Sequence, residues 1–206
     1  MHKQKGFFEY LGFAGLVSML ALAAGWMAII FLFQNLPYVA IIFEVLAFYF
    51  DTLDGYVARK TRTVSEFGKL LDSTLDFFNY SVFSALLFWK FLLPNSIGIL
   101  VGYIILSTGA FRLSRFNVEG FVIKNKQYYY SGIVVCHISL TVIILFFLKQ
   151  IYPAIITFIS TPIVIIISVM QISRIMTKKT STYSFWLTIA FVILITSLFF
   201  QLWHKY

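Results

Sequence analysis

Residues 36–89 read LPYVAIIFEVLAFYFDTLDGYVARKTRTVSEFGKLLDSTLDFFNYSVFSALLFW. This stretch consists of two largely apolar runs, Leu36 to Lys60 and Ser65 to Trp89, and a short polar turn joins them. Each run is long enough to cross the hydrocarbon core of a bilayer, which takes roughly 20 residues of α-helix. Because the turn is short, the two helices are expected to be antiparallel neighbours. The stretch therefore predicts a membrane-embedded helical hairpin.

The rest of the chain has the same apolar character. Of its 206 residues, 60% are hydrophobic and only 12% are charged, whereas about 25% of a typical soluble domain is charged. A water-soluble fold has no interior large enough to hide this apolar excess, so we expect lipid to be the solvent. Five further runs are long enough to span a bilayer: Leu11 to Phe33, Ser96 to Leu113, Tyr129 to Leu148, Pro153 to Ser173 and Tyr183 to Trp203.

These runs predict an all-α fold, a polytopic membrane helix bundle of about 6–8 transmembrane helices. We expect residues 1–206 to form a single integral-membrane domain, in which the hairpin at about 36–92 carries the candidate site. Loops rich in Lys and Arg stay in the cytoplasm. With a cytoplasmic N-terminus, three of the 16 basic residues, Lys90, Lys149 and Lys205, fall outside. We therefore expect a multi-pass protein whose basic cytoplasmic face attracts anionic membrane lipids, and no nucleic acid.

Four aspartates gather at the ends of the hairpin helices that face the turn. Asp51, Asp54, Asp72 and Asp76 lie within 26 positions. A carboxylate at the edge of a membrane is costly unless it is paired or binds a metal, so these residues are functional candidates. Residues three or four apart share a helix face, so the two pairs form stripes that can face each other. Because all the ligands are oxygens, the expected ions are Mg²⁺, Mn²⁺ or Ca²⁺.

Small and basic residues accompany the acids. Gly55, Ala58 and Gly68 lack bulk on the same stripes, which leaves room for a flat base or a diphosphate. Arg59 could clamp a phosphate. From spacing alone, the hairpin predicts a metal-assisted transferase or hydrolase that acts on a diphosphate at the membrane surface.

From Asp51 to Asp76 the sequence reads DTLDGYVARKTRTVSEFGKLLDSTLD. It resembles the CDP-alcohol phosphatidyltransferases, whose signature D-x2-D-G-x2-A-R-x8-G-x3-D-x3-D it matches at every fixed position. The resemblance covers Leu11 to about Phe147. It implies a transferase of phospholipid biosynthesis that uses a CDP-activated lipid of the CDP-diacylglycerol type and releases CMP.

The resemblance also implies roles for single residues. In the family, the first three aspartates hold two divalent metals on the diphosphate, which makes Asp51, Asp54 and Asp72 ligands of two Mg²⁺ or Mn²⁺ ions. The fourth, Asp76, is expected at the same metal site as the catalytic general base for the acceptor hydroxyl.

The family's two glycines and its Ala-Arg pair line the nucleotide site. By this resemblance Gly55, Ala58, Arg59 and Gly68 are expected to bind the donor.

Two segments are similar to those of one subfamily, the phosphatidylserine synthases. They are RLSRFN, from Arg112 to Asn117, and SEFGKLLDS, from Ser65 to Ser73. This likeness implies L-serine as the acceptor, with phosphatidylserine as the product. Arg112, Arg115 and Asn117 are the candidate acceptor-binding residues.

Other interpretations stay open. The acceptor could be glycerol 3-phosphate or inositol phosphate, because Arg112 and Arg115 suit a phosphate as well as a carboxylate. An intramembrane prenyltransferase also uses Asp-rich motifs and Mg²⁺ on a diphosphate, although its two motifs usually lie far apart. A cation transporter would place its acids near the bilayer midplane.

Two features lie outside the motif. Gly98 and Gly102 form a G-x-x-x-G pattern, which permits close helix packing and suggests a homodimer as a further hypothesis. Glu44 lies inside an apolar run and has no evident partner in the sequence.

Overall fold

The computed structural model describes residues 7–61, 65–124, 127–178 and 183–203. Its helical elements are α1 (Phe7–Phe33), α2 (Pro37–Lys60), α3 (Glu66–Asp76), the π-helix η1 (Phe77–Val82), α4 (Phe83–Leu87), the π-helix η2 (Phe88–Leu92), α5 (Ser96–Glu119), α6 (Cys136–Ile151), α7 (Pro153–Ile172) and α8 (Tyr183–Trp203). The described residues also contain the short strands β1 (Val122–Lys124), β2 (Gln127–Ser131) and β3 (Met176–Lys178). The prediction of an all-α membrane bundle is confirmed, and a small sheet is added to it.

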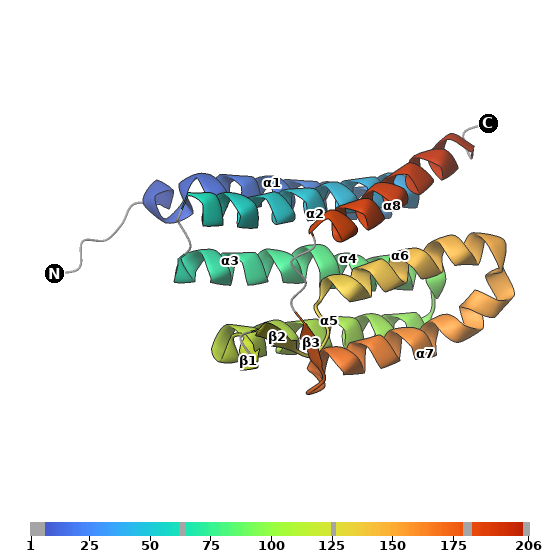
Figure 1. The fold of residues 1–206 in the computed structure, drawn as a ribbon. Coiled ribbons are helices and arrows are strands. Elements are labelled where there is room, and N and C mark those ends of the chain that lie inside the picture. Colours follow the sequence, from blue (N-terminus) through green and yellow to red (C-terminus); the bar gives the residue numbers. More distant parts are fainter. Residues whose placement is uncertain (1–6, 62–64, 125–126, 179–182, 204–206) are drawn as a thin grey trace.

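The helices form three layers, which Figure 1 shows from the side. One outer layer contains α1, α2 and α8, and the other contains α5 and α7. Between them lie α6 and the helical segment that runs from α3 through η2. The two helices of the predicted hairpin, α2 and α3, are antiparallel, and α1 packs against both. Residues 62–64, which belong to the predicted turn, lie outside the described residues.

Within the described residues, three helical stretches are long and apolar enough to cross a membrane. They are Gly12–Phe33, Ser96–Glu119 and Pro153–Ile172. The apolar helices Cys136–Ile151 and Leu187–Leu202 are shorter. Large apolar side chains on the long helices are exposed, among them Phe158, which is 84% exposed. A surface of this kind suits contact with lipid, because soluble proteins rarely expose large continuous apolar patches.

At two glycines of α5, a neighbouring segment lies so close that it leaves little room for a larger side chain. A Cβ atom placed on Gly102 would lie 3.6 Å from the Cβ of Ala85 on α4, and one on Gly98 would overlap the carbonyl oxygen of Leu93. Small residues let helix backbones approach closely in this way. The G-x-x-x-G pattern is therefore used inside the chain, and the homodimer remains a hypothesis.

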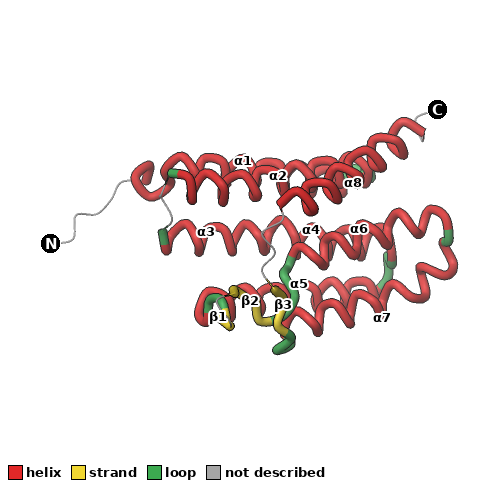
Figure 2. The backbone as a smooth tube through the Cα atoms, viewed as in Figure 1, coloured by secondary structure: helices red, strands yellow, loops and turns green. Residues whose placement is uncertain are grey.

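The predicted fifth span, Tyr129 to Leu148, is wrong at its beginning. Residues 129–131 belong to β2, and the helix α6 begins only at Cys136. The three strands pair antiparallel in the order β1-β2-β3, with Tyr129 opposite both Val122 and Lys178. Consecutive tyrosines favour strand structure. In a search for membrane spans they count as apolar residues, so the predicted span included this strand. Figure 2 shows this sheet beside one end of α5.

At the end of the bundle opposite the sheet, two lysines donate hydrogen bonds to main-chain carbonyls. Lys90 Nζ donates to the Phe33 carbonyl at 3.0 Å. Lys149 Nζ donates to the carbonyls of Phe91 and Leu92 at 2.9 and 2.8 Å. These carbonyls lie at the ends of α1 and η2, where helices lack internal partners. Both lysines were predicted on the outer side, as was Lys205, which lies outside the described residues.

Candidate active site

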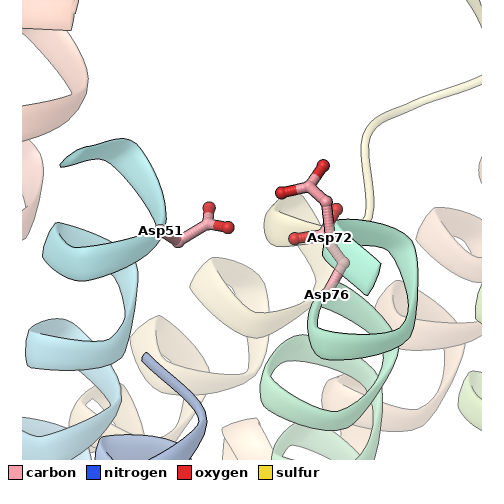
Figure 3. A group of neighbouring side chains, drawn as sticks. All are labelled: Asp51, Asp72 and Asp76. Atoms are coloured by element: carbon pink, nitrogen blue, oxygen red, sulfur yellow. The ribbon is translucent and has the colours of Figure 1, made fainter. Parts of the chain in front are cut away.

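Three carboxylates from two helices meet at one site. Asp51 comes from α2, and Asp72 and Asp76 come from successive turns of α3. One carboxylate oxygen from each residue lies within 4.8 Å of the other two. Figure 3 shows Asp51 facing the other two across the space between the helices. The structure thus brings together three of the four predicted metal ligands, and we call these three residues the aspartate cluster.

The beginning of α3 explains the position of its two aspartates. The Ser65 hydroxyl oxygen accepts a hydrogen bond from the Gly68 amide at 3.0 Å and caps the helix. A cap of this kind satisfies one of the amides that have no partner in the first turn. From that starting point, Asp72 and Asp76 are four residues apart and lie on one helix face. Asp72 is exposed, and Asp76 is half-buried.

Asp54 lies outside the aspartate cluster as the structure defines it. This side chain is buried, and its Oδ2 atom accepts a hydrogen bond of 2.5 Å from the hydroxyl of Ser18 on α1. Asp54 and Asp51 are three residues apart on α2 and lie on neighbouring positions of one face. The assignment of Asp54 as a metal ligand therefore remains a prediction.

The predicted donor-binding residues lie at the two helix ends that the predicted turn joins. Gly55, Ala58 and Arg59 belong to the last turns of α2, and Gly68 belongs to the first turn of α3. A Cβ atom on Gly55 would lie 3.3 Å from Nη1 of Arg59, so the Arg59 side chain folds back over that glycine. Gly68 is exposed. A Cβ atom on Gly68 would lie 3.2 Å from the Ser65 hydroxyl oxygen, so both glycines make room for neighbouring side chains of their own helix ends. Nucleotide binding at these residues stays a prediction.

Arg112 approaches the aspartate cluster from α5. The residue is only 3% exposed, and its guanidinium carbon lies 5.3 Å from the ring centre of Phe116 and 5.6 Å from that of Tyr130. Its positive charge acts on Asp72 and Asp76. Among the described residues, the buried Nε atom has no hydrogen-bond partner. Leaving a buried donor unpaired costs about 1–3 kcal/mol, and an acceptor bound at this atom would relieve that cost.

Arg115 is engaged elsewhere. Its Nη1 atom donates to the Ile172 carbonyl at 2.9 Å. Its Nη2 atom donates to the carbonyls of Ser131, Gln171 and Ser173 at 2.7, 3.2 and 3.0 Å. These bonds join the end of α7 to β2. Arg115 therefore connects structural elements, and its predicted role toward the acceptor has no support from its contacts.

Asn117 bridges two helices. Its Oδ1 atom accepts a hydrogen bond of 2.8 Å from the hydroxyl of Ser73, the residue that follows Asp72. The bond ties the end of α5 to α3, next to the aspartate cluster. A role of Asn117 in binding the acceptor directly remains a prediction.

The aspartate cluster has the chemistry of a site for hard cations. Its donors are carboxylate oxygens only, which suit Mg²⁺ and Mn²⁺. Carboxylates this close repel one another, and a divalent cation between them relieves the repulsion. Lys69 Nζ lies 2.8 Å from Glu66 Oε1 on the exposed side of α3, so this lysine is paired with an acid outside the aspartate cluster. The residues present therefore fit a divalent metal.

Comparison with known proteins agrees with this geometry. The CDP-alcohol phosphatidyltransferase family matches residues 11–204, which is nearly the whole chain. The chain belongs to this family. The match includes α7 and α8, so it extends beyond the Leu11 to Phe147 region over which the sequence resemblance was predicted.

Three relatives show the closer likeness within the phosphatidyltransferase family. The chain is 37% identical over 121 residues to the archaetidylserine synthase of Methanothermobacter thermautotrophicus, across 57% of this chain and 52% of that protein. It is 41% identical over 109 residues to the CDP-diacylglycerol–serine O-phosphatidyltransferase of Methanocaldococcus jannaschii, across 52% of this chain and 50% of that protein. It is 35% identical over 98 residues to the Bacillus subtilis protein of the same name, across 46% and 55%. The chain spans about half the length of the curated relatives it matches.

These names confirm the predicted likeness to phosphatidylserine synthases within the phosphatidyltransferase family. Two hydroxyl groups that contact the aspartates were not predicted from the sequence. Ser18 bonds Asp54, and the Tyr80 hydroxyl donates to Asp51 Oδ2 at 2.9 Å. Both donors come from elements remote in sequence from the aspartates that they contact. Residue spacing therefore carries no signal for either contact.

Glu44 has a partner in the structure that the sequence did not reveal. Its Oε1 atom accepts a hydrogen bond of 3.2 Å from Ser139 on α6, and its Oε2 atom has no partner among the residues that the structure describes. The residue lines a small cavity of about 50 Å³ together with Tyr80, Cys136 and residues of α8. The side chain is 2% exposed, so the single hydroxyl compensates only part of the cost of burying it.

Proposed function

We propose that this protein transfers a phosphatidyl group from CDP-diacylglycerol, or a CDP-lipid with other chains, to the hydroxyl of L-serine, with release of CMP. The aspartate cluster beside the buried Arg112 is the observation that carries the proposal. Family membership supports the reaction class, and the names of the three relatives support serine as the acceptor.

Asp51, Asp54 and Asp72 would hold two divalent ions, Mg²⁺ or Mn²⁺, with Asp76 at the same site. Bound there, the ions supply Lewis acidity that polarises the diphosphate and stabilises charge on the departing CMP. Of the proposed ligands, Asp54 is turned toward Ser18, so it requires a change of rotamer or use of its second oxygen. A carboxylate has lone pairs enough for both partners.

Asp76 is the proposed general base. It lies one helical turn deeper than Asp72 and is half-buried, so it borders the space between α2 and α3 on the side away from solvent. The serine oxygen forms a bond to the phosphorus that carries the lipid, while the bond from that phosphorus to the CMP oxygen breaks. Asp76 takes the proton of the serine hydroxyl during this displacement.

Arg112 is the proposed acceptor-binding residue. Its guanidinium is held against Phe116 and Tyr130, which fixes the plane of the fork. A planar fork can bind the serine carboxylate through two parallel hydrogen bonds. Serine bound in that way has its hydroxyl beside the aspartate cluster. The entropy of orienting serine is then lost on binding, so it does not add to the barrier of the reaction.

Gly55, Ala58, Arg59 and Gly68 are the proposed donor-binding residues. The two glycines and the alanine let a nucleotide approach the helix backbones, and Arg59 neutralises phosphate charge. We also propose a multi-pass arrangement in which this end of the bundle faces the cytoplasm, because the basic residues of the sequence favour that side.

The test is CMP release by the purified chain with CDP-diacylglycerol and Mn²⁺ or Mg²⁺. The acceptors offered are L-serine, glycerol 3-phosphate and inositol phosphate, and L-alanine serves as the matched control because it lacks only the hydroxyl. We expect release with L-serine and competitive inhibition by L-alanine. A clear preference for glycerol 3-phosphate or inositol phosphate would refute the serine assignment, and absence of CMP release with every acceptor would refute the reaction class.

A further inference from the structure

We infer that Tyr80 is a positioning residue of the proposed metal site, where its phenol holds the Asp51 carboxylate in place for a divalent cation. The inference rests on the proposed function, because it assumes that the aspartate cluster binds metal. It concerns a residue outside the family signature, four positions beyond its last aspartate.

The contact itself is direct. The Tyr80 hydroxyl donates to Asp51 Oδ2 at 2.9 Å, and Tyr80 is 4% exposed. Hydrogen bonds from a neutral donor to a carboxylate are charge-assisted and stronger than those between neutral groups. The bond therefore connects α2 to the helical segment that carries Asp72 and Asp76.

The π-helix η1 keeps Tyr80 in line with the two aspartates. Asp72, Asp76 and Tyr80 follow one another at intervals of four residues. An α-helix has about 3.6 residues per turn, so side chains four apart drift around its axis. The wider turn of the π-helix, which begins at Phe77, reverses that drift. The phenol thus stays on the side of the segment that faces α2.

Two glycines on neighbouring helices let side chains of η1 pack directly against those helices. A Cβ atom on Gly25 of α1 would overlap the Asn79 side chain, and one on Gly109 of α5 would overlap the Ser81 hydroxyl. Asn79, Tyr80 and Ser81 are all buried. The residues on either side of Tyr80 are therefore wedged against neighbouring helices, which leaves the phenol little freedom to leave Asp51.

A phenol is suited to this task because it is a neutral donor. A lysine or arginine at the same place would neutralise Asp51 and compete with a metal for its oxygens. Without any partner, the Asp51 carboxylate would turn away from Asp72 and Asp76, which repel it. One bond from Tyr80 opposes that rotation and leaves lone pairs available for a cation. Groups that orient metal ligands in this way commonly change metal affinity about 10–100-fold when they are removed.

The experiment is Mn²⁺ binding to the purified full-length chain, measured by titration calorimetry for the parent and for two variants. Tyr80→Phe removes the hydroxyl and keeps the ring, which lines the cavity beside Glu44. Tyr49→Phe is the matched control, because that hydroxyl donates to the Leu187 carbonyl at 3.2 Å, away from the aspartates. We expect Tyr80→Phe to weaken Mn²⁺ binding roughly tenfold, and Tyr49→Phe to bind as the parent does.

Activity gives a second measurement. Weaker binding by Tyr80→Phe predicts that a higher Mn²⁺ concentration is needed for half-maximal CMP release, with near-parental kcat once Mn²⁺ is saturating. Melting in chelator measures the contribution of the bond to folding by itself. The variant should melt somewhat below the parent, because a buried hydrogen bond is lost, and should still unfold in one cooperative transition.

Each outcome decides the inference. Parental Mn²⁺ affinity in Tyr80→Phe would overturn the role of Tyr80 and leave the proposed function standing. Loss of affinity together with equal loss in Tyr49→Phe would also overturn it, because the effect would then be general. Failure of the parent chain to bind Mn²⁺ would refute the metal site itself, and the role of Tyr80 with it.

Discussion

Charged side chains have different hydrogen-bond partners at the two ends of the bundle. At the end away from the aspartates, Lys90 and Lys149 donate to main-chain carbonyls, so their charges stabilise helix ends. At the other end, Asp51 and Asp54 accept hydrogen bonds from the neutral hydroxyls of Tyr80 and Ser18. A lysine that donates to main-chain carbonyls stabilises helix ends, whereas a hydroxyl that donates to a carboxylate leaves other lone pairs of that carboxylate available for a cation. This difference distinguishes the proposed site from the lysine end of the bundle.

The same contrast separates two arginines one helical turn apart on α5. Arg115 gives its guanidinium to four carbonyls and joins α7 to β2. Arg112 is buried, its guanidinium lies over the rings of Phe116 and Tyr130, and its Nε atom has no hydrogen-bond partner within the part of the chain that the structure describes. The sequence places both arginines in one segment, and their surroundings give them different tasks.

Asp72→Asn is expected to have the largest effect. It removes the exposed charge of the aspartate cluster, so CMP release should fall about a thousandfold, a loss typical of a principal electrostatic contact in a reacting site. The fold should persist, because the change also relieves repulsion among the carboxylates. The control is Glu66→Gln, which removes an exposed partner of Lys69 on the same helix. Near-normal CMP release by a folded Asp72→Asn variant would contradict the metal site.

Replacing each arginine by lysine sharpens the comparison between them. Lysine keeps the charge and loses the planar fork. Arg112→Lys should raise the KM for serine about tenfold, which corresponds to about 1.4 kcal/mol, with little change in the KM for CDP-lipid. Arg115→Lys should leave the KM for serine unchanged and lower the melting temperature. An increase in the serine KM with Arg115→Lys alone would reverse the two roles.

A smaller effect is expected at the opposite end. Lys149→Met keeps the apolar stem and removes the two bonds to the carbonyls of η2. We expect a loss of about 1 kcal/mol in the free energy of unfolding, with kcat and both KM values unchanged. Denaturation of the parent and the variant in the same detergent measures the first, and CMP release the second. A change in catalysis with unchanged stability would show that the two ends are not independent.

Residue spacing in the sequence predicted the helices and the helix faces on which the aspartates lie. The intervals of three and four residues put Asp51 on one helix face and Asp72 and Asp76 on another, and the structure brings these faces together. The apolar runs predicted the helices within a few residues at most ends. The exceptions are the end of α5, which continues to Glu119 beyond the predicted Leu113, and β2, where the tyrosines of residues 128–130 look apolar and pair with neighbouring strands.

Contacts between distant segments could not be predicted in this way. Tyr80 is 29 residues from Asp51, and Ser139 is 95 residues from Glu44. Each contact depends on how helices pack, and that packing depends on glycines such as Gly25 and Gly109, whose effect appears only when the facing side chain is known. The tasks of Arg112 and Arg115 differ for the same reason.

The location of the metal tests the central claim most directly. Crystals of the full-length chain grown with Mn²⁺ would show the ion by its anomalous scattering. We predict anomalous density between α2 and α3, in contact with carboxylate oxygens of Asp51, Asp72 and Asp76, and its loss in crystals of Asp72→Asn. Density at another place, or none at a Mn²⁺ concentration that saturates CMP release, would contradict this claim.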